Sequence, residues 1–104
     1  MSDTAFEWLQ QWYVDHLDGE WEHQNGVRIE TLDNPGWSLL VDIGEAELRE
    51  RAFAPVAVER SEHNWIHARV GDGRFKAFGG PGNLPEMIAI FRDWAEGRGR
   101  LAAE

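Results

Sequence analysis

The sequence has no cysteine, and this absence removes several kinds of chemistry at once. Without cysteine there is no disulfide, no thiolate zinc site and no cysteine nucleophile. The first ten residues, MSDTAFEWLQ, contain neither a basic region nor an apolar run, so we expect no signal peptide. Nowhere does an apolar run approach the roughly 18 residues that a membrane-spanning helix needs. We therefore expect a cytoplasmic protein that makes no contact with a membrane.

Positive charge is also scarce. Lys and Arg number 10 against 19 Asp and Glu, which gives a formal net charge of -9. Binding to a phosphate backbone requires clustered Lys and Arg, so we expect no nucleic acid partner. An acidic surface suits a basic protein partner, because complementary charge accelerates the encounter of the two molecules.

The chain is long enough for one domain with its own hydrophobic core. It has 104 residues, and six tryptophans and five phenylalanines can fill much of that core. Gly97 is typical of the residue that ends a helix. We therefore predict a single domain over residues 1–97 and a frayed C-terminal tail over residues 98–104.

Two amphipathic helices are predicted near the ends of the chain. Thr4 and Glu7 have the spacing of a capping box and predict a helix over residues 4–17. Asn83, with Pro85 in the first turn, predicts the start of a second helix that ends at Gly97. In the first helix one half of the circumference is apolar and is expected to face the core; its members are Ala5, Phe6, Trp8, Leu9, Trp12, Tyr13, His16 and Leu17.

Between these helices the sequence alternates apolar and polar residues and predicts strands. The five stretches are VRIETLD, WSLLVDI, FAPVAVER, WIHARV and RFKAF. Pro35 and Gly36 suit the centre of a type II turn, and GDG is a hairpin signal. We predict an α+β fold: an antiparallel five-stranded sheet, a meander, flanked by an N-terminal and a C-terminal helix packed on one face. The order of strands in the sheet is not fixed by these patterns.

The alternation also predicts which side chains the second, open face of the sheet carries. An open face of mixed charge with an aromatic residue is a plausible interaction surface, so a general adaptor protein is one alternative function. The predicted residues are Arg28, Glu30, Asp42, Glu59, Trp65, His67, Arg69 and Lys76.

The stretch DGEWEH, Asp18 to His23, is dense in groups that could perform chemistry. Asp18, Glu22 and His23 could ligate a metal, and a small metal-dependent hydrolase is therefore a second alternative function. The spacing, however, is neither that of HExxH nor that of the calcium-binding loop. No nucleophile motif or phosphate-binding loop accompanies it. We predict no catalytic residue, no metal and no cofactor, and an acidic surface instead.

Several stretches in order resemble the immunity protein 53 family of bacterial polymorphic toxin systems. They are EWLQQWY, DGEWEH, GVRIETLDNPGW, ERSEHNWI and FGGPGNLPEMIAIFRDW, and the resemblance covers the chain from about Phe6 to Trp94. The resemblance implies a cytosolic antidote, encoded beside a toxin, that protects the producing cell.

From this resemblance and the acidity we predict a protein that binds its toxin stoichiometrically, without catalysis. It would cover the active site or an adjacent exosite of a basic toxin domain. We expect a monomer or weak homodimer. The residues predicted to contact the toxin are Asp18, Glu20, Glu22 and Asp33 for their charge and Trp21 and Trp65 as apolar anchors.

Overall fold

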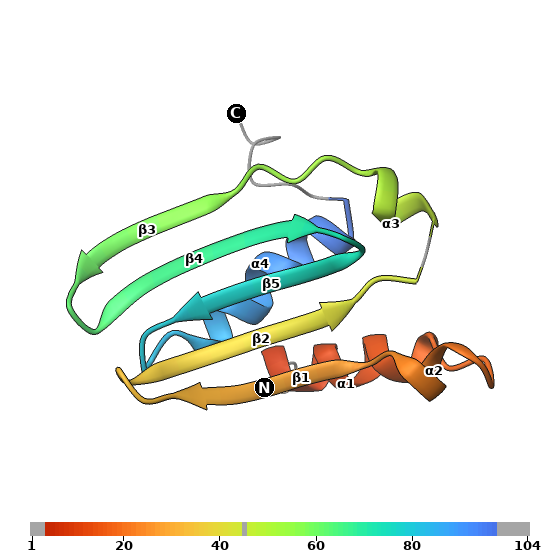
Figure 1. Ribbon diagram of the computed structural model, residues 1–104, viewed down its shortest axis with the longest axis horizontal. Coiled ribbons are helices and arrows are strands. Elements are labelled where there is room, and N and C mark those ends of the chain that lie inside the picture. Colours follow the sequence, from red (N-terminus) through yellow and green to blue (C-terminus); the bar gives the residue numbers. More distant parts are fainter. Residues whose placement is uncertain (1–3, 45, 98–104) are drawn as a thin grey trace.

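The computed structural model describes residues 4–44 and 46–97, so the predicted tail lies outside the described part of the chain (Figure 1). The helices are α1 (Ala5–Asp15), α2 (Trp21–Gln24), α3 (Ala46–Glu50) and α4 (Leu84–Ala95). The strands are β1 (Val27–Leu32), β2 (Gly36–Asp42), β3 (Val56–Ser61), β4 (Asn64–Gly71) and β5 (Arg74–Gly79).

The five strands form one antiparallel sheet, and the predicted α+β class is confirmed. The order across the sheet is β1-β2-β5-β4-β3. The chain thus winds as a hairpin, β1-β2, and a three-stranded meander, β3-β4-β5, which join where β2 pairs with β5. The link over residues 43–55, which contains α3, is long enough to carry the chain to the far edge of the sheet. Short-range patterns do not encode that choice of edge.

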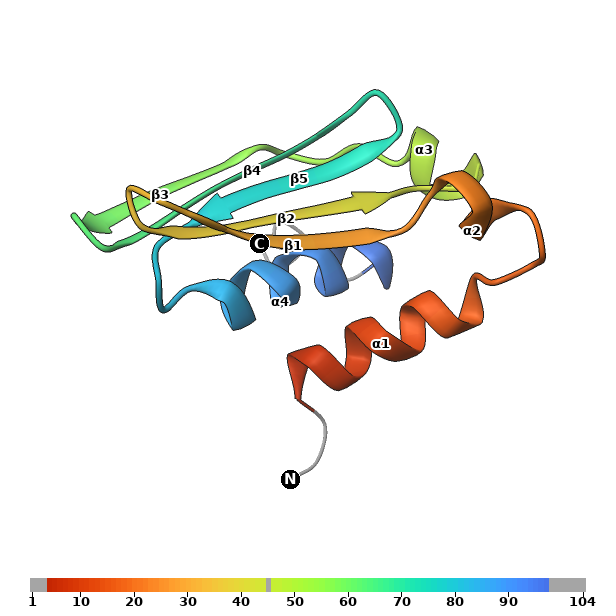
Figure 2. The same cartoon turned by 60° about the horizontal axis from the view of Figure 1, so that its bottom comes forward.

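Both long helices lie on the same face of the sheet, as predicted (Figure 2). The core joins the inner face of the sheet to α4, whose buried residues are Leu84, Met87, Ile88, Ile90, Phe91 and Trp94. From the sheet it takes fully covered residues such as Leu39, Val41, Ile66 and Phe75. Burial of this apolar area is the main favourable term in folding.

Helix α1 begins with the predicted capping box. The Glu7 amide donates to Thr4 Oγ1 over 3.0 Å, and the Thr4 amide donates to Glu7 Oε1 over 3.3 Å. The predicted apolar half, however, is only partly covered. Leu9 and Trp12 are buried, whereas Phe6, Tyr13 and Leu17 are exposed by 49%, 36% and 43%. The prediction was wrong for these three, because α1 packs mainly on α4 and leaves its other flank open.

The entry to α4 differs from the prediction in its hydrogen bonds. Asn83 occupies the N-cap position but makes no side-chain capping bond. Its amide Nδ2 instead donates to Asn64 Oδ1 over 3.0 Å, and its Oδ1 accepts from the Trp65 amide over 3.3 Å. Asn83 is therefore buried as a link between the start of β4 and the start of α4.

The β1–β2 turn is also displaced from its predicted position. It consists of Asp33, Asn34 and Pro35, with a cis Asn34–Pro35 peptide, and Gly36 is already the first residue of β2. A Cβ at Gly36 would collide with the carbonyl of Gly79 on β5. Glycine is thus required there by the close approach of a neighbouring strand and not by a type II turn.

Phe91 connects the two helices to the sheet, and its truncation tests that role. It contacts Trp8, Trp12, Phe75 and Trp94, at ring-centroid distances between 5.0 and 6.1 Å. We expect Phe91→Ala to lower the free energy of unfolding in urea by about 3–5 kcal/mol. The half-exposed Phe6→Ala should cost less than about 1 kcal/mol. Equal losses in the two variants would contradict this packing.

Candidate functional site

The stretch Asp18–His23 is held together by its own backbone. Asp18 Oδ1 accepts hydrogen bonds from the amides of Glu20 and Trp21, both over 2.8 Å, and so caps α2. Glu22 reaches back and accepts from the amides of Asp18 and Gly19 over 3.1 and 2.9 Å. This reciprocal arrangement has the logic of a capping box and fixes the conformation of the loop.

These hydrogen bonds also favour the charged forms of both carboxylates. The amides of Trp21 and Glu20 hold the pKa of Asp18 below its usual range. The pKa of Glu22 is likewise lowered, by its own amide and by those of Asp18 and Gly19. Both groups therefore carry full negative charge at neutral pH. The stabilisation that they give is complete there and is lost as the pH falls through the lowered pKa values.

Trp21 packs inward from this loop. Its ring lies 6.0 Å from that of Trp12, edge-on, and 5.9 Å from that of Tyr13. A Cβ at Gly44 would come within 2.6 Å of Cδ1 of Trp21, so Gly44 leaves the space that the indole fills. The side chain is half-buried and packs between α1 and the segment that follows β2.

Asp33 and Trp65 lie at the opposite end of the sheet from this loop. Asp33 is exposed in the β1–β2 turn, while α2 precedes the other end of β1. Trp65, near the start of β4, is half-buried on the open face beside His67, with ring centroids 5.4 Å apart. A shallow cleft of about 370 Å³ adjoins it, and its lining residues include Glu59 and Glu62. The six predicted contact residues therefore form two separate groups, one at each end of the sheet.

The open face carries the residues predicted for it, and they have both charges: Glu30, Asp42 and Glu59 lie on it beside several Lys and Arg. Of the 10 Lys and Arg in the chain, Arg28, Arg69, Arg74 and Lys76 lie on it. The strand register places three of them, together with Leu40, in one row across four strands: Arg28, Leu40, Lys76 and Arg69.

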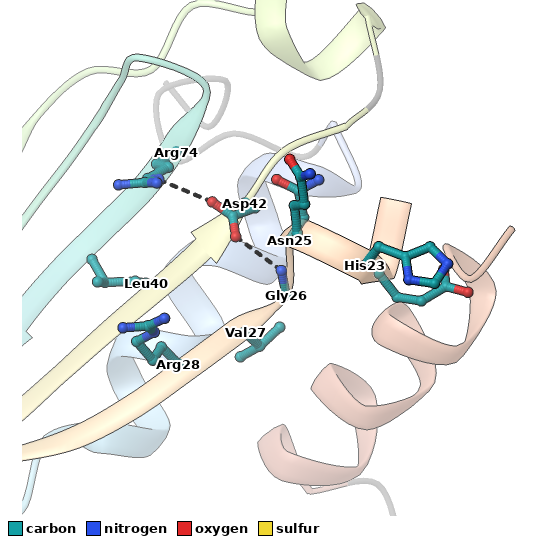
Figure 3. Close-up of a pocket in the computed structure, with 10 residues that line it drawn as sticks. His23, Asn25, Gly26, Val27, Arg28, Leu40, Asp42 and Arg74 are labelled. Carbon is teal, nitrogen blue, oxygen red and sulfur yellow. Dashed lines mark hydrogen bonds and ion pairs between the residues drawn. The ribbon is translucent and has the colours of Figure 1, made fainter. Parts of the chain in front are cut away.

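A cleft of about 380 Å³ opens where this row meets α2 (Figure 3). Asp42 lies on its wall, where it accepts from Arg74 Nε over 2.9 Å and from the Gly26 amide over 2.8 Å. Arg28, Leu40 and His23 are further lining residues. The cleft is polar and has no buried titratable cluster, so among the described residues its chemistry is that of a binding surface.

The two N-terminal helices are acidic and contain no Lys or Arg, a feature that our sequence interpretation did not detect. The first 27 residues contain six Asp and Glu and no Lys or Arg, and they include all of α1 and α2. The sequence does show this feature, because its first Lys or Arg is Arg28. The net charge of each segment reveals the acidic N-terminal part, whereas the net charge of the whole chain does not.

Within residues 4–44 and 46–97, no group of three or more His, Asp or Glu is arranged to hold a metal ion. Asp18 and Glu22, two of the three residues of the alternative hydrolase site, have oxygens engaged by backbone amides. In the same ranges no helix is long and apolar enough to cross a membrane. Nothing in the geometry favours either alternative function.

The fold and these surfaces define a small α+β protein with one covered and one open sheet face and with two acidic N-terminal helices. The chain belongs to the immunity protein 53 family, whose family model matches residues 6–96. This confirms the resemblance noted in the sequence. Neither a curated protein nor a solved structure matches the chain. Membership in this family implies an immunity protein with a toxin as its partner and suggests a role other than catalysis.

The capping role of Asp18 can be tested by an NMR pH titration. In the native protein the amide shifts of Glu20 and Trp21 should titrate with a midpoint below about 3.9, the value of an unperturbed aspartate. Asp18→Ala should abolish this titration and speed hydrogen exchange at both amides. Glu20→Ala, which removes an exposed side chain from the same loop, should change neither. A midpoint at or above that of free aspartate would refute the hydrogen-bonded cap.

Proposed function

We propose that this protein neutralises a cognate bacterial toxin by binding it stoichiometrically and covering its active site or an adjacent exosite, without catalysing a reaction. The family match is the observation that carries the proposal. It spans residues 6–96 and thus covers every described helix and strand except the first residue of α1. The whole fold, and not a single motif, is therefore what the family shares.

The charge distribution supports a basic toxin domain. The acidic side formed by α1 and α2 would attract such a domain over a range set by the ionic strength. A specific complex buries roughly 800 Å² on each partner, an area that one side of this molecule can supply. Steering of this kind raises the association rate, which matters for a protein that must act before its toxin does.

Within the acidic loop the carboxylates have different roles. The carboxylates of Asp18 and Glu22 accept hydrogen bonds from backbone amides and remain negatively charged. The Glu20 carboxylate makes no hydrogen bond or ion pair with any described residue, and it is exposed. We propose that Glu20 contacts the toxin directly, on a loop that Asp18 and Glu22 hold in place. A loop ordered in advance loses less entropy on binding.

The remaining predicted contacts stay part of the proposal. Trp21 supports the acidic loop from below, and its exposed part would form the apolar centre beside it. Asp33 and Trp65 would belong to a second contact region at the other end of the sheet. We further propose that the protein acts in the cytoplasm, as a monomer or weak homodimer, where it meets its own toxin.

Co-expression tests the proposed function. The toxin domain encoded next to the gene for this protein should arrest growth when expressed alone. Co-expression with the protein should restore growth, and the two chains should elute together at one-to-one stoichiometry. A toxin domain from an unrelated system serves as the control and should not be rescued. Failure to rescue combined with failure to form a complex would contradict the proposal.

The electrostatic part of the proposal predicts a salt dependence. The association rate with the toxin domain should fall several-fold as ionic strength rises from ~0.05 to ~0.5 M, while the dissociation rate changes much less. Stopped-flow fluorescence of the six tryptophans can follow the reaction. Glu20→Gln should reduce both the rate and its salt dependence, whereas Glu50→Gln, exposed on α3, should not. A rate insensitive to salt would exclude steering by the acidic side.

A further inference from the structure

The exposed apolar side chains of this protein are concentrated on one helix. Among the described residues, the exposed large apolar side chains are Phe6, Tyr13, Val14 and Leu17, all from the α1 segment. At 100° per residue, Phe6 and Tyr13 lie about 20° apart on α1, and Leu17 follows just beyond the end of the helix at Asp15. We call these three side chains the α1 stripe. Single exposed apolar residues are ordinary, but a contiguous set of them marks an interaction surface.

The stripe lies on the outer flank of α1, away from α4. Trp8 and Trp12 reach Phe91 of α4, with ring centroids 5.8 and 5.1 Å away, and so define the flank that α4 covers. Figure 1 shows α1 behind β1, at the side of the sheet, while α4 lies behind its middle. Phe6 and Tyr13 lie about 100–160° around the helix from Trp8 and Trp12, so they are turned away from α4. They belong to the helix that lies behind the edge strand β1.

That edge has unpaired backbone groups. The amide of Asp42 donates to Gly26 O over 3.0 Å, so Gly26 and Asp42 form a hydrogen-bonded pair. The ladder alternates, and the amides and carbonyls of Val27, Ile29 and Thr31 therefore point away from β2. No described strand pairs with them, since β1 is the end of the sheet.

The two edges of the sheet differ in how they are protected. Strand β3 follows Pro55 directly and has a register shift between Glu59 and Ser61. Proline and bulges are the devices that prevent an edge from pairing with another chain. Strand β1 contains no proline and pairs with β2 in unbroken register along its length. The edge strand that lies in front of α1 is thus the one left open.

We propose that the free edge of β1 and the α1 stripe form one docking groove, which binds an extended basic segment of the toxin as a sixth strand. The inference depends on the proposed function only for the identity of the partner. Apolar side chains on alternate residues of the added strand would pack on Phe6, Tyr13 and Leu17. Backbone hydrogen bonds to β1 supply affinity in such strand addition, and the side-chain contacts supply specificity.

Charge selects this occupant over a second copy of the chain. The first 27 residues, which form α1 and α2, carry six acidic side chains and no Lys or Arg. Two copies joined edge to edge would bring these acidic helices together, and like charge disfavours that contact. A partner segment rich in Lys and Arg meets opposite charge along the same groove.

Hydrogen exchange measured by NMR gives a residue-by-residue signature of the added strand. In complex with the toxin domain, the amides of Val27, Ile29 and Thr31 should become protected. Those of Arg28 and Glu30, already bonded to β2, should change little. Protection that arises on the open face, for instance at Arg69 and Lys76, would overturn the groove while leaving toxin binding intact.

Paired variants test the two components of the groove. Thr31→Pro removes one outward-pointing amide of β1. An edge strand tolerates proline at such a position, so the variant should fold but bind about tenfold or more weakly. Thr31→Val keeps the amide and should bind normally. The double variant Phe6→Ser with Leu17→Ser should likewise lose at least about tenfold. Val14→Ser, about 80–100° around the helix from Phe6 and Tyr13, should lose less than about twofold. A thermal melt confirms that each variant is folded.

A synthetic peptide separates this inference from the proposed function. A peptide of about nine residues that alternates valine and lysine matches the length of a strand, and it should protect the same three β1 amides. The same peptide with glutamate in place of lysine should not bind. If the toxin domain does not bind but the lysine peptide does, the proposed function fails and the groove stands. If neither the toxin domain nor the lysine peptide protects these amides, the groove is refuted.

Discussion

The contact of Trp8 and Trp12 with Phe91 determines how the surfaces of this protein are arranged. It fastens α1 to α4, so that α1 lies at the side of the sheet and presents its outer flank to solvent. Trp8 Nε1 adds a hydrogen bond of 2.8 Å to Glu96 at the end of α4. Were α1 instead centred on the sheet, its apolar half would be covered. The exposed stripe is therefore a consequence of the aromatic packing.

The same arrangement separates charge. Helices α1 and α2 carry acidic side chains and no Lys or Arg, whereas the open sheet face carries four of the chain's 10 Lys and Arg. The net charge of -9 for the whole chain therefore does not show how charge is distributed between these helices and the open face. Toward the basic partner that we propose, acidic charge concentrated on one side would accelerate the encounter more than the same charge spread evenly.

Much of the fold could be predicted from the sequence because its signals are local. The capping box of Thr4 and Glu7, the alternating strands and the α4 face follow from spacing alone. The strand order could not be predicted, because a long link such as residues 43–55 can reach either edge of the sheet. The exposure of Phe6, Tyr13 and Leu17 was missed for a similar reason: periodicity shows which residues share a face and not how much of that face another element covers.

The candidate site shows the same limit. Asp18 and Glu22 were predicted to contribute acidic charge, but their hydrogen bonds to the backbone depend on a local geometry that composition does not specify. Asp33 and Trp65 proved to be remote from these two residues because β1 separates the β1–β2 turn from α2.

Titration of toxin activity with the purified protein tests most directly the claim that neutralisation is stoichiometric binding. Activity should fall linearly and reach zero at one equivalent of protein per toxin domain, and it should return when the complex is dissociated. Complete loss of activity at a small fraction of an equivalent, or a chemically altered toxin recovered afterwards, would show that the protein acts as a catalyst and would contradict the account.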